Sequence, residues 1–163
     1  FPTRRSSDLR FATTDIHPMS ISADYDQDFF AWITHNAQLL RSGRLSEVDA
    51  EHVAEELESM GKRDLRQLRS RLQVLIMHLL KWEHQPDKRG PSWLTAIDHQ
   101  RDEIEALLLD SPSLRPRLAA AVARIYAKAV RDAARETGLA EDALPHECPY
   151  ELDDMLATGF LPD

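Results

Sequence analysis

The chain has 163 residues, a formal net charge of −8 and one cysteine. This length is normal for one domain with an apolar core, and the acidic balance disfavours non-specific nucleic-acid binding, because phosphates are neutralised by Lys and Arg. A single cysteine excludes an internal disulfide, and no run of 18 apolar residues is available to span a membrane. With no signal peptide expected either, the sequence predicts a cytoplasmic protein with no membrane partner.

The first nine residues, FPTRRSSDL, can be back-translated into the end of a common sequencing adapter. They have no apolar period and no helix cap, which agrees with a segment that is not native protein. We therefore expect residues 1–18 to be non-native adapter and read-through sequence that is disordered, and Met19 to be the natural start. The remaining chain, residues 19–163, is predicted to form a single all-helical domain.

Helical periodicity begins soon after Met19. The first helix is expected over about residues 26–42, because Gly43 is a natural residue to end it. Its inward face is expected to carry Phe30, Ile33, Ala37 and Leu40, widened by Phe29, Trp32 and Leu39. A second helix is predicted from Ser46, its N-cap, to Gly61, since the run SEVD resembles a capping box.

The third predicted helix has the clearest pattern in the chain. Leucines and a tryptophan recur at steps of three and four: Leu65, Leu68, Leu72, Leu75, Leu79 and Trp82. Such a stripe fits the central helix of a bundle or a coiled-coil seam, and the bundle is favoured because the repeat lasts under three heptads. With Gly61 as the turn, the second and third helices are expected to form an antiparallel hairpin.

Two further helices and a short one complete the expected fold. Ser92 is predicted to cap a helix that ends at residues 111–113, and Ser113 to cap the next, which ends at Gly138. After Pro145 a short last helix is expected over residues 150–157. The predicted fold class is all-α: a single-domain, largely antiparallel helical bundle of about five main helices plus a short C-terminal helix.

A series of phrases also occurs in a recognisable order. They are YDQDFFAW, LLRSGRL, EELESMG, LRSRLQVLIMHLLKW, QPDKRGPSW, DSPSLRP and LPHECPYELDDMLATGFLPD. In this order they resemble the bacterial domain-of-unknown-function 29 family, over about residues 25–163. The resemblance implies a small, all-helical, stand-alone bacterial protein, and it implies no activity.

Histidine, carboxylate and thiol side chains are the candidates for chemistry. His52 and Glu55 share a helix face, but dimetal sites in bundles use two Glu-x-x-His pairs and further Glu residues. His52 and Glu55 are therefore weak metal candidates, and no cofactor is expected. Cys148 lies two residues from His146 in a loop, without an orienting third group, so no catalytic residue is predicted.

A basic face is expected at the start of the third predicted helix. It consists of Lys62, Arg63, Arg66 and Arg69. Cations there oppose the helix dipole, and in the predicted hairpin Glu55 and Glu58 approach Arg66 and Arg69 as compensating partners. A nucleic-acid site is the alternative, but aromatic interleaving and a helix-turn-helix are missing from the sequence, so nucleic acid is the less favoured partner.

Trp82 and Trp93 flank the loop HQPDKRGPS, which also contains Lys88 and Arg89. Aromatic and arginine side chains are enriched in binding hot spots, while tryptophans at helix ends also close cores, so both interpretations stay open. The function favoured by the sequence is a non-catalytic protein-interaction or accessory module. A nucleic-acid-associated regulator that uses the basic face comes second, and a metal-dependent enzyme third. A protein partner is expected, and a homodimer is one form it can take.

Overall fold

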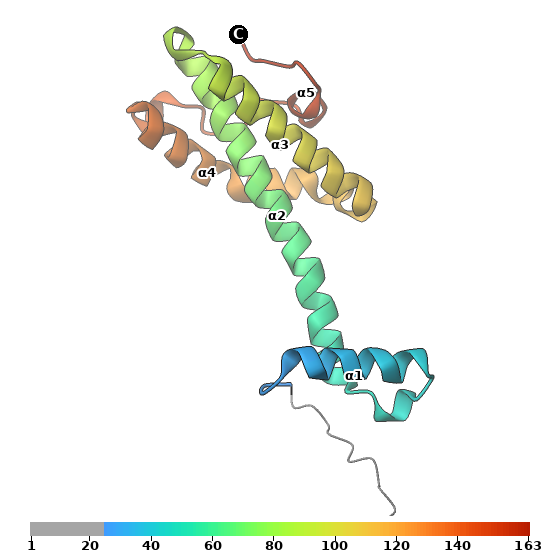
Figure 1. The fold of residues 1–163 in the computed structure, drawn as a ribbon. Coiled ribbons are helices and arrows are strands. Elements are labelled where there is room, and N and C mark those ends of the chain that lie inside the picture. The colour runs from blue at the N-terminus through green and yellow to red at the C-terminus, as the bar shows by residue number, and fades with distance from the viewer. Residues whose placement is uncertain (1–24) are drawn as a thin grey trace, which may run out of the picture. The chain divides into compact units, whose positions relative to one another are not determined.

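The computed structural model describes residues 25–163, so the predicted adapter segment and the predicted start at Met19 lie outside the described residues. Helices make up the regular structure of the described chain, as Figure 1 shows. They are α1 (Phe29–Arg41), α2 (Ala50–His84), α3 (Pro91–Asp110), α4 (Leu118–Thr137) and the short α5 (Leu152–Leu156). Single turns of 3-10 helix join them: η1 (Leu45–Glu47), η2 (Pro86–Lys88), the longer η3 (Pro112–Arg117) and η4 (Glu141–Ala143). The predicted all-α fold is confirmed.

The contacts of the chain gather in two compact units, which are described separately below. The first unit ends at Glu55, and its described part is residues 25–55. The second unit is Glu56–Asp163. Among the described residues, none of the helices combines the length and apolar character needed to cross a bilayer.

The prediction of two helices separated at Gly61 is wrong, because α2 continues without a break from Ala50 to His84. A glycine inside a helix costs about 1 kcal/mol relative to alanine. The Glu, Leu, Met, Lys and Arg residues around Gly61 are good helix formers and offset that cost. The predicted hairpin therefore does not form. Glu55 and Glu58 lie one behind the other on the same helix as Arg66, and not across from it.

In the first unit, α1 is fixed at both ends. The side chain of Asp28 accepts a hydrogen bond from the amide of Ala31 at 3.0 Å, so the helix begins three residues later than predicted. Gly43 has φ 72°, which agrees with its predicted role at the end of the helix. The predicted cap of the next helix is wrong. Ser46 lies in η1, and Asp49 accepts the amide of His52 at 3.4 Å at the start of α2.

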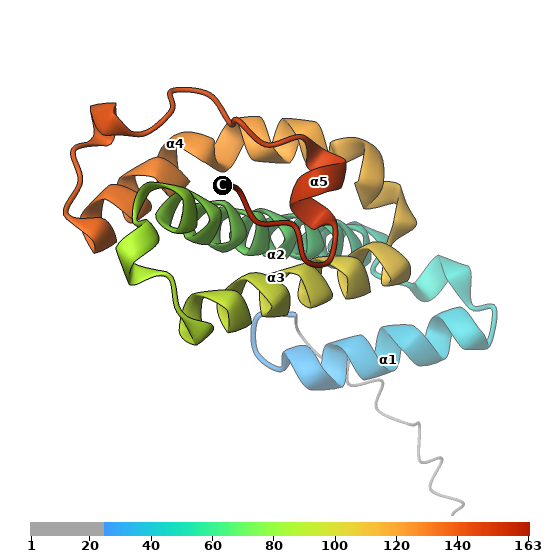
Figure 2. The ribbon, with the colours of Figure 1, turned by 90° about the horizontal axis from the view of Figure 1, so that it is seen from above.

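The second unit is a bundle in which α3 and α4 flank α2, as Figures 1 and 2 show. The predicted leucine stripe forms the centre of its core. The side chains without exposed surface are Leu68, Leu72, Leu75, Ile76, Leu79, Leu80, Ile97, Ala129, Ala133 and Met155. Leu65 and Trp82, at the two ends of the stripe, pack against this core and are partly buried. On α4, Leu118, Val122 and Ile125 are buried and complete this core.

The starts of α3 and α4 differ from the predicted ones. Gly90 occupies the N-cap position of α3 and Pro91 its first turn, so Ser92 is not the cap. Proline suits that turn because the amide it lacks has no helical acceptor there. The chain then makes the longer 3-10 turn η3 before α4 begins at Leu118, and Ser113 lies inside that turn. Gly138 ends α4 with φ 77°, as predicted.

Candidate interaction surfaces

The loop of residues 82–93, which we call the tryptophan loop, joins α2 to α3. Arg89 donates through Nε to the carbonyl of Trp82 at 2.8 Å, and its guanidinium carbon lies 5.3 Å from the centre of that indole ring. Lys81 places Nζ 4.7 Å from the centre of the Trp93 ring. Lys88 is exposed. The structure thus places the guanidinium of Arg89 against the ring of Trp82. Each of the two indole rings therefore already has a cationic side chain of this protein next to it.

Lys81 has a structural role that the sequence did not indicate. Its side chain is buried, and Nζ donates to Glu136 of α4 at 2.5 Å. Nearby, Gln85 donates through Nε2 to the carbonyl of Thr137 at 3.0 Å. These bonds tie the end of α2 to the end of α4. Several polar side chains around the tryptophan loop are therefore used to hold α2 to α4, which leaves fewer of them to bind a partner.

The predicted basic face lies on α2. Lys62, Arg63 and Arg66 are exposed, while Arg69 is partly buried and its Nε has no hydrogen-bond partner within the described residues. Lys62 pairs with Glu58 at 3.1 Å, one turn earlier on the same helix. Pairs of this exposed kind contribute little to stability. The basic residues were expected to pair with glutamates of an opposing helix. In the structure, the nearby glutamates precede them on the same helix instead.

His52 and Glu55 do not come together as a metal site. The ring nitrogen Nδ1 of His52 lies 2.8 Å from Oδ2 of Asp49, which also accepts the indole N–H of Trp32 at 3.0 Å. The imidazole stacks on Tyr25, with 4.4 Å between ring centres. The hydrogen bond to Asp49 is the main cause that raises the pKa of His52. Across residues 25–163, side chains of the metal-binding types do not gather in groups of three or more.

Cys148 and His146 line one pocket of about 460 Å³ next to α4. The thiol points at the carbonyl of Tyr150, with the sulfur at 3.8 Å, and burial raises the pKa of Cys148. A raised pKa keeps the sulfur in its protonated, weakly nucleophilic form.

The hydroxyl groups of two tyrosines at this pocket are also engaged. The hydroxyl of Tyr150 donates to Glu83 at 2.7 Å, and that of Tyr126 to the carbonyl of Pro145 at 2.8 Å. Burial raises the pKa of Tyr126 to about 12.

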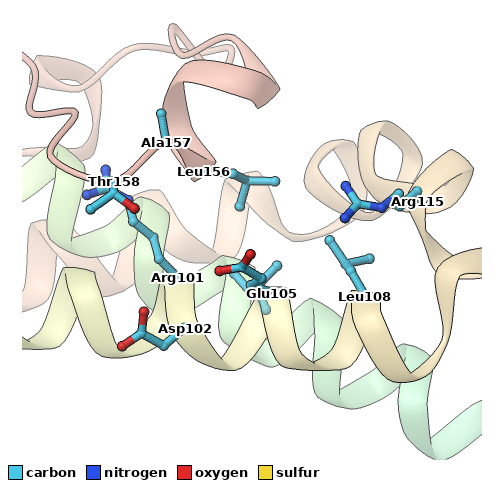
Figure 3. A pocket seen from close by; sticks show the side chains of 9 residues that line it. Arg101, Asp102, Glu105, Leu108, Arg115, Leu156, Ala157 and Thr158 are labelled. Atoms are coloured by element: carbon cyan, nitrogen blue, oxygen red, sulfur yellow. The ribbon is translucent and has the colours of Figure 1, made fainter.

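A second pocket, of about 290 Å³, lies between α3, η3 and α5 (Figure 3). Arg101 extends from α3 toward the C-terminal segment, where it donates to the carbonyls of Met155 at 3.0 Å and Phe160 at 2.6 Å. Its third nitrogen, Nη1, lies 3.5 Å from a carboxylate oxygen of Asp98. Arg101 therefore holds the C-terminal segment on the bundle, a role that the sequence did not indicate.

The largest difference from the sequence analysis concerns α1. Trp32, Asn36 and Leu39 form its buried face. The inward face predicted for Phe30, Ile33 and Leu40 is wrong, because these side chains are 79%, 41% and 46% exposed. Phe29, at 45%, extends the same side. We call the four exposed residues Phe29, Phe30, Ile33 and Leu40 the α1 stripe. Apolar residues occupy more than half of the helix circumference, so spacing alone could not decide which arc is covered.

Comparison with known proteins identifies a family. The sequence model of the family described as "Domain of unknown function DUF29" matches residues 25–161. Searches of the curated proteins and of the solved structures found no match. The expected family is confirmed, and its description names no activity, substrate or partner.

Proposed function

The chain belongs to the DUF29 family, and from this premise we propose that it is a non-catalytic protein-interaction module whose contact surface is the α1 stripe. The observation that supports the proposal is the exposure of four large apolar side chains along one side of one helix. Contiguous exposed apolar surface is rare on monomeric proteins and marks interaction sites when it occurs. Aromatic side chains such as Phe29 and Phe30 are common anchors of protein interfaces.

The stripe is presented by a helix whose other side is fixed. Asn36 is buried, donates through Nδ2 to the carbonyl of Trp32 at 3.0 Å and accepts the amide of Asp49 at 2.9 Å. The indole of Trp32 adds its bond to the same Asp49. These bonds fix the rotation of α1, so the stripe does not have to be ordered when a partner binds. A pre-organised surface loses less conformational entropy on association.

The spacing of the stripe defines the partner chemistry. Phe30, Ile33 and Leu40 are separated by three and seven residues, so they form one ridge along the helix. A ridge of this kind fits an apolar groove or the apolar face of another amphipathic helix. The proposed partner is therefore a protein with an apolar groove or helix face, bound mainly by burial of the two phenylalanines.

The two alternative functions have weaker support. For a nucleic-acid-associated regulator, the basic face of α2 directly follows a run of glutamates on the same helix, which reduces the local positive potential that phosphates require. For a metal-dependent enzyme, His52 already uses Nδ1 toward Asp49, and Glu55 is exposed one turn further along. Neither surface has the contiguous, pre-organised character of the α1 stripe.

In-cell photo-cross-linking tests the proposal. A photoreactive phenylalanine analogue replaces Phe30 in one version of the full chain and Leu109 of α3, which is 66% exposed, in a matched control. We expect a discrete cross-linked protein from the Phe30 position alone, and loss of that product when Ile33→Glu is added. Equal products from both positions, or none from Phe30, would contradict an interaction role for the stripe.

A further inference from the structure

The outer side of α4 carries a line of cations. Its four members recur at steps of four, three and four residues: Arg124, Lys128, Arg131 and Arg135. At about 100° per residue, they lie within an arc of about 60° on one side of the helix, and all four are exposed. We call this line, which is about 17 Å long at about 1.5 Å per residue, the basic ridge.

The two acids of α4 are bonded to α2. Asp132 accepts a hydrogen bond from Nε2 of Gln73 at 2.6 Å, and Glu136 accepts one from the buried Lys81 at 2.5 Å. Neither acid falls within the arc of the basic ridge, because both lie toward the side on which α4 packs against α2. The solvent side of α4 is therefore left to its cations.

Ion pairs within the chain neutralise only part of the basic ridge. Lys128 pairs with Asp132 at 3.0 Å, and Arg135 pairs with the same carboxylate at 3.3 Å. A single carboxylate thus balances two cations, and its side chain is only 16% exposed. Arg124 and Arg131 make no ion pair with any residue that the structure describes. The ridge therefore presents positive charge that this part of the chain leaves uncompensated.

The basic face of α2 borders the basic ridge. Arg69 lies one turn before Gln73 on the same side of α2, and Gln73 contacts α4 through Asp132. Near the start of α4, Arg117 of η3 lines a pocket of about 430 Å³ together with Lys62 of α2. We call the combined set the α2–α4 basic surface: Arg66, Arg69, Arg117, Arg124, Lys128, Arg131 and Arg135. All of its members belong to the unit Glu56–Asp163.

Acids limit this surface at two edges. On α2, Glu58 pairs with Lys62 at 3.1 Å, so we leave Lys62 out of the surface. Beside α4, Glu141 and Asp142 line a pocket together with Arg131. The positive potential is therefore strongest between these edges, along the line where α4 lies against α2.

We propose that the α2–α4 basic surface binds the phosphate backbone of a nucleic-acid duplex without reading its sequence. Six of its seven cations are arginines. The guanidinium group presents a planar fork of donors that matches the oxygens of a phosphate, and it stays charged at every physiological pH. Contacts to phosphates position a protein on a duplex but carry no sequence information.

The side chains beside the basic ridge favour a duplex over other anionic partners. They are Ala120 and Ala127, both exposed, and the arc of the ridge contains no larger apolar side chain. A protein interface is built around aromatic or large apolar anchors, and a helix bound to a membrane surface inserts such side chains. Binding of a single strand uses aromatic rings on which the bases stack. The phosphates of a duplex require none of these.

This binding is separate from the α1 stripe and goes beyond the proposed function. The net charge of −8 opposes it, but at physiological ionic strength charges are largely screened beyond about 8 Å, so the local surface dominates. Backbone-only binding is weak and depends strongly on salt, with dissociation constants of about 1–100 μM. We expect affinities in this range.

Fluorescence anisotropy tests the proposal with the full chain and labelled duplexes of DNA and of RNA over a series of salt concentrations. About four or five phosphate contacts predict that log K falls linearly with log salt, with a slope of about −4. Arg124→Gln with Arg131→Gln should weaken binding about tenfold or more and make the slope shallower by about two. Both positions are exposed and glutamine is a good helix former, so the thermal midpoint should stay the same.

A matched control removes the same charge elsewhere. It carries Lys88→Gln in the tryptophan loop and Arg115→Gln at the pocket of Figure 3, and it should bind like the native chain. Arg66→Gln tests the surface independently on α2, and it should make the slope shallower by about one. Absence of binding to both duplexes at low salt, or equal losses in the α4 variant and the control, would overturn the proposal.

Two further probes separate a duplex from other anionic partners. Polyglutamate presents carboxylates, as an acidic protein does, and vesicles of phosphatidylcholine and phosphatidylserine present an anionic membrane surface. We expect both to bind more weakly than the duplexes at the same salt concentration. Tighter binding of either one would overturn the duplex and assign the surface to that class of partner. The cross-links expected from Phe30 do not depend on these residues, so the proposed function would stand or fall separately.

Discussion

In the unit Glu56–Asp163 the apolar stripes of the long helices face inward, whereas in the described part of the first unit the α1 stripe faces outward. The larger unit has a closed apolar core in which Leu68, Leu75 and Leu79 have no exposed surface. Among residues 25–55 of the smaller one, the large apolar side chains that are buried are Trp32 and Leu39, together with the polar Asn36. The same periodicity of apolar residues therefore makes a core in one unit and a surface in the other.

Polar bonds also differ between the two units. In residues 25–55 they are partly buried and link the two helices: Asp49 accepts from Trp32 and contacts His52, and Asn36 joins α1 to the start of α2. In the larger unit the buried bond from Arg101 to the carbonyl of Met155 is added to an extensive apolar core. The described part of the smaller unit therefore relies on a few partly buried hydrogen bonds and has little apolar area to stabilise it. We therefore expect the two units to respond differently to the same kind of substitution.

The largest effect is expected from the apolar core. Leu75→Ala should lower the free energy of unfolding of the larger unit by about 2–5 kcal/mol, because it removes buried methyl groups and leaves a cavity. Urea unfolding followed by circular dichroism measures this change. Leu109→Ala, at an exposed position of α3, should change the same quantity by about 0.5 kcal/mol or less. Similar losses for both would mean that the core does not carry the stability of this unit.

A smaller effect is expected where the C-terminal segment meets the bundle. Arg101→Met should cost about 2–4 kcal/mol, since it removes two charge-assisted bonds and leaves the carbonyl of Met155 buried without its donor. The loss should be local, so amide hydrogen exchange should accelerate over residues 152–163 before the rest of the unit. Thr158→Ala, at the rim of the same pocket, is the control and should leave exchange unchanged. Uniform acceleration across the unit would contradict a local clamp.

The core of the larger unit could be predicted from the sequence because regularly spaced leucines mark one side of α2 along its second half. The steps of three and four from Leu65 to Trp82 leave a single side of α2 to be covered, and that side is buried. The prediction failed at Gly61, where a residue typical of helix ends lies inside a helix. Local composition cannot show this, because the continuation of α2 depends on the strong helix formers on both sides and on the packing of its second half.

The candidate surfaces were predictable to a smaller extent. Trp82 and Arg89 do come together, since they are close in sequence around one loop. The roles of Lys81 and Arg101 depend on partners 54 or more positions away in the sequence. The exposure of Phe30 depends on which arc of a broad apolar face is covered. Asn36 within the apolar arc of α1 was the one available signal. A polar residue among apolar ones indicates the side where a specific hydrogen bond is made.

In the smaller unit, Asn36→Ala should have a local effect of about 1–2 kcal/mol, because it removes the bond that joins α1 to the amide of Asp49. Amide hydrogen exchange should accelerate over residues 32–49, and Trp32 fluorescence should shift as the indole becomes more exposed. Gln38→Ala, on an exposed side of the same helix, should change neither observable. An effect that spreads evenly to the larger unit would show that the two units unfold together.

The smallest effect is a change of pH dependence at His52. Its hydrogen bond to Asp49 raises the pKa above the ordinary 6.5, so the protonated ring stabilises the first unit. This contribution is complete below the pKa of the unfolded chain and is lost as the pH rises through the higher pKa of the folded chain. Titration of the ring by NMR should show the raised pKa, and Asp49→Asn should bring it back toward 6.5. Asparagine keeps one side-chain oxygen, which can still accept the amide of His52, whereas the NH2 group that replaces Oδ2 cannot accept the indole N–H of Trp32. Trp32 fluorescence therefore checks in parallel whether α1 stays in place. An unchanged pKa in that variant would assign the shift to Glu51 and Glu55, whose charges act on His52 in the same direction.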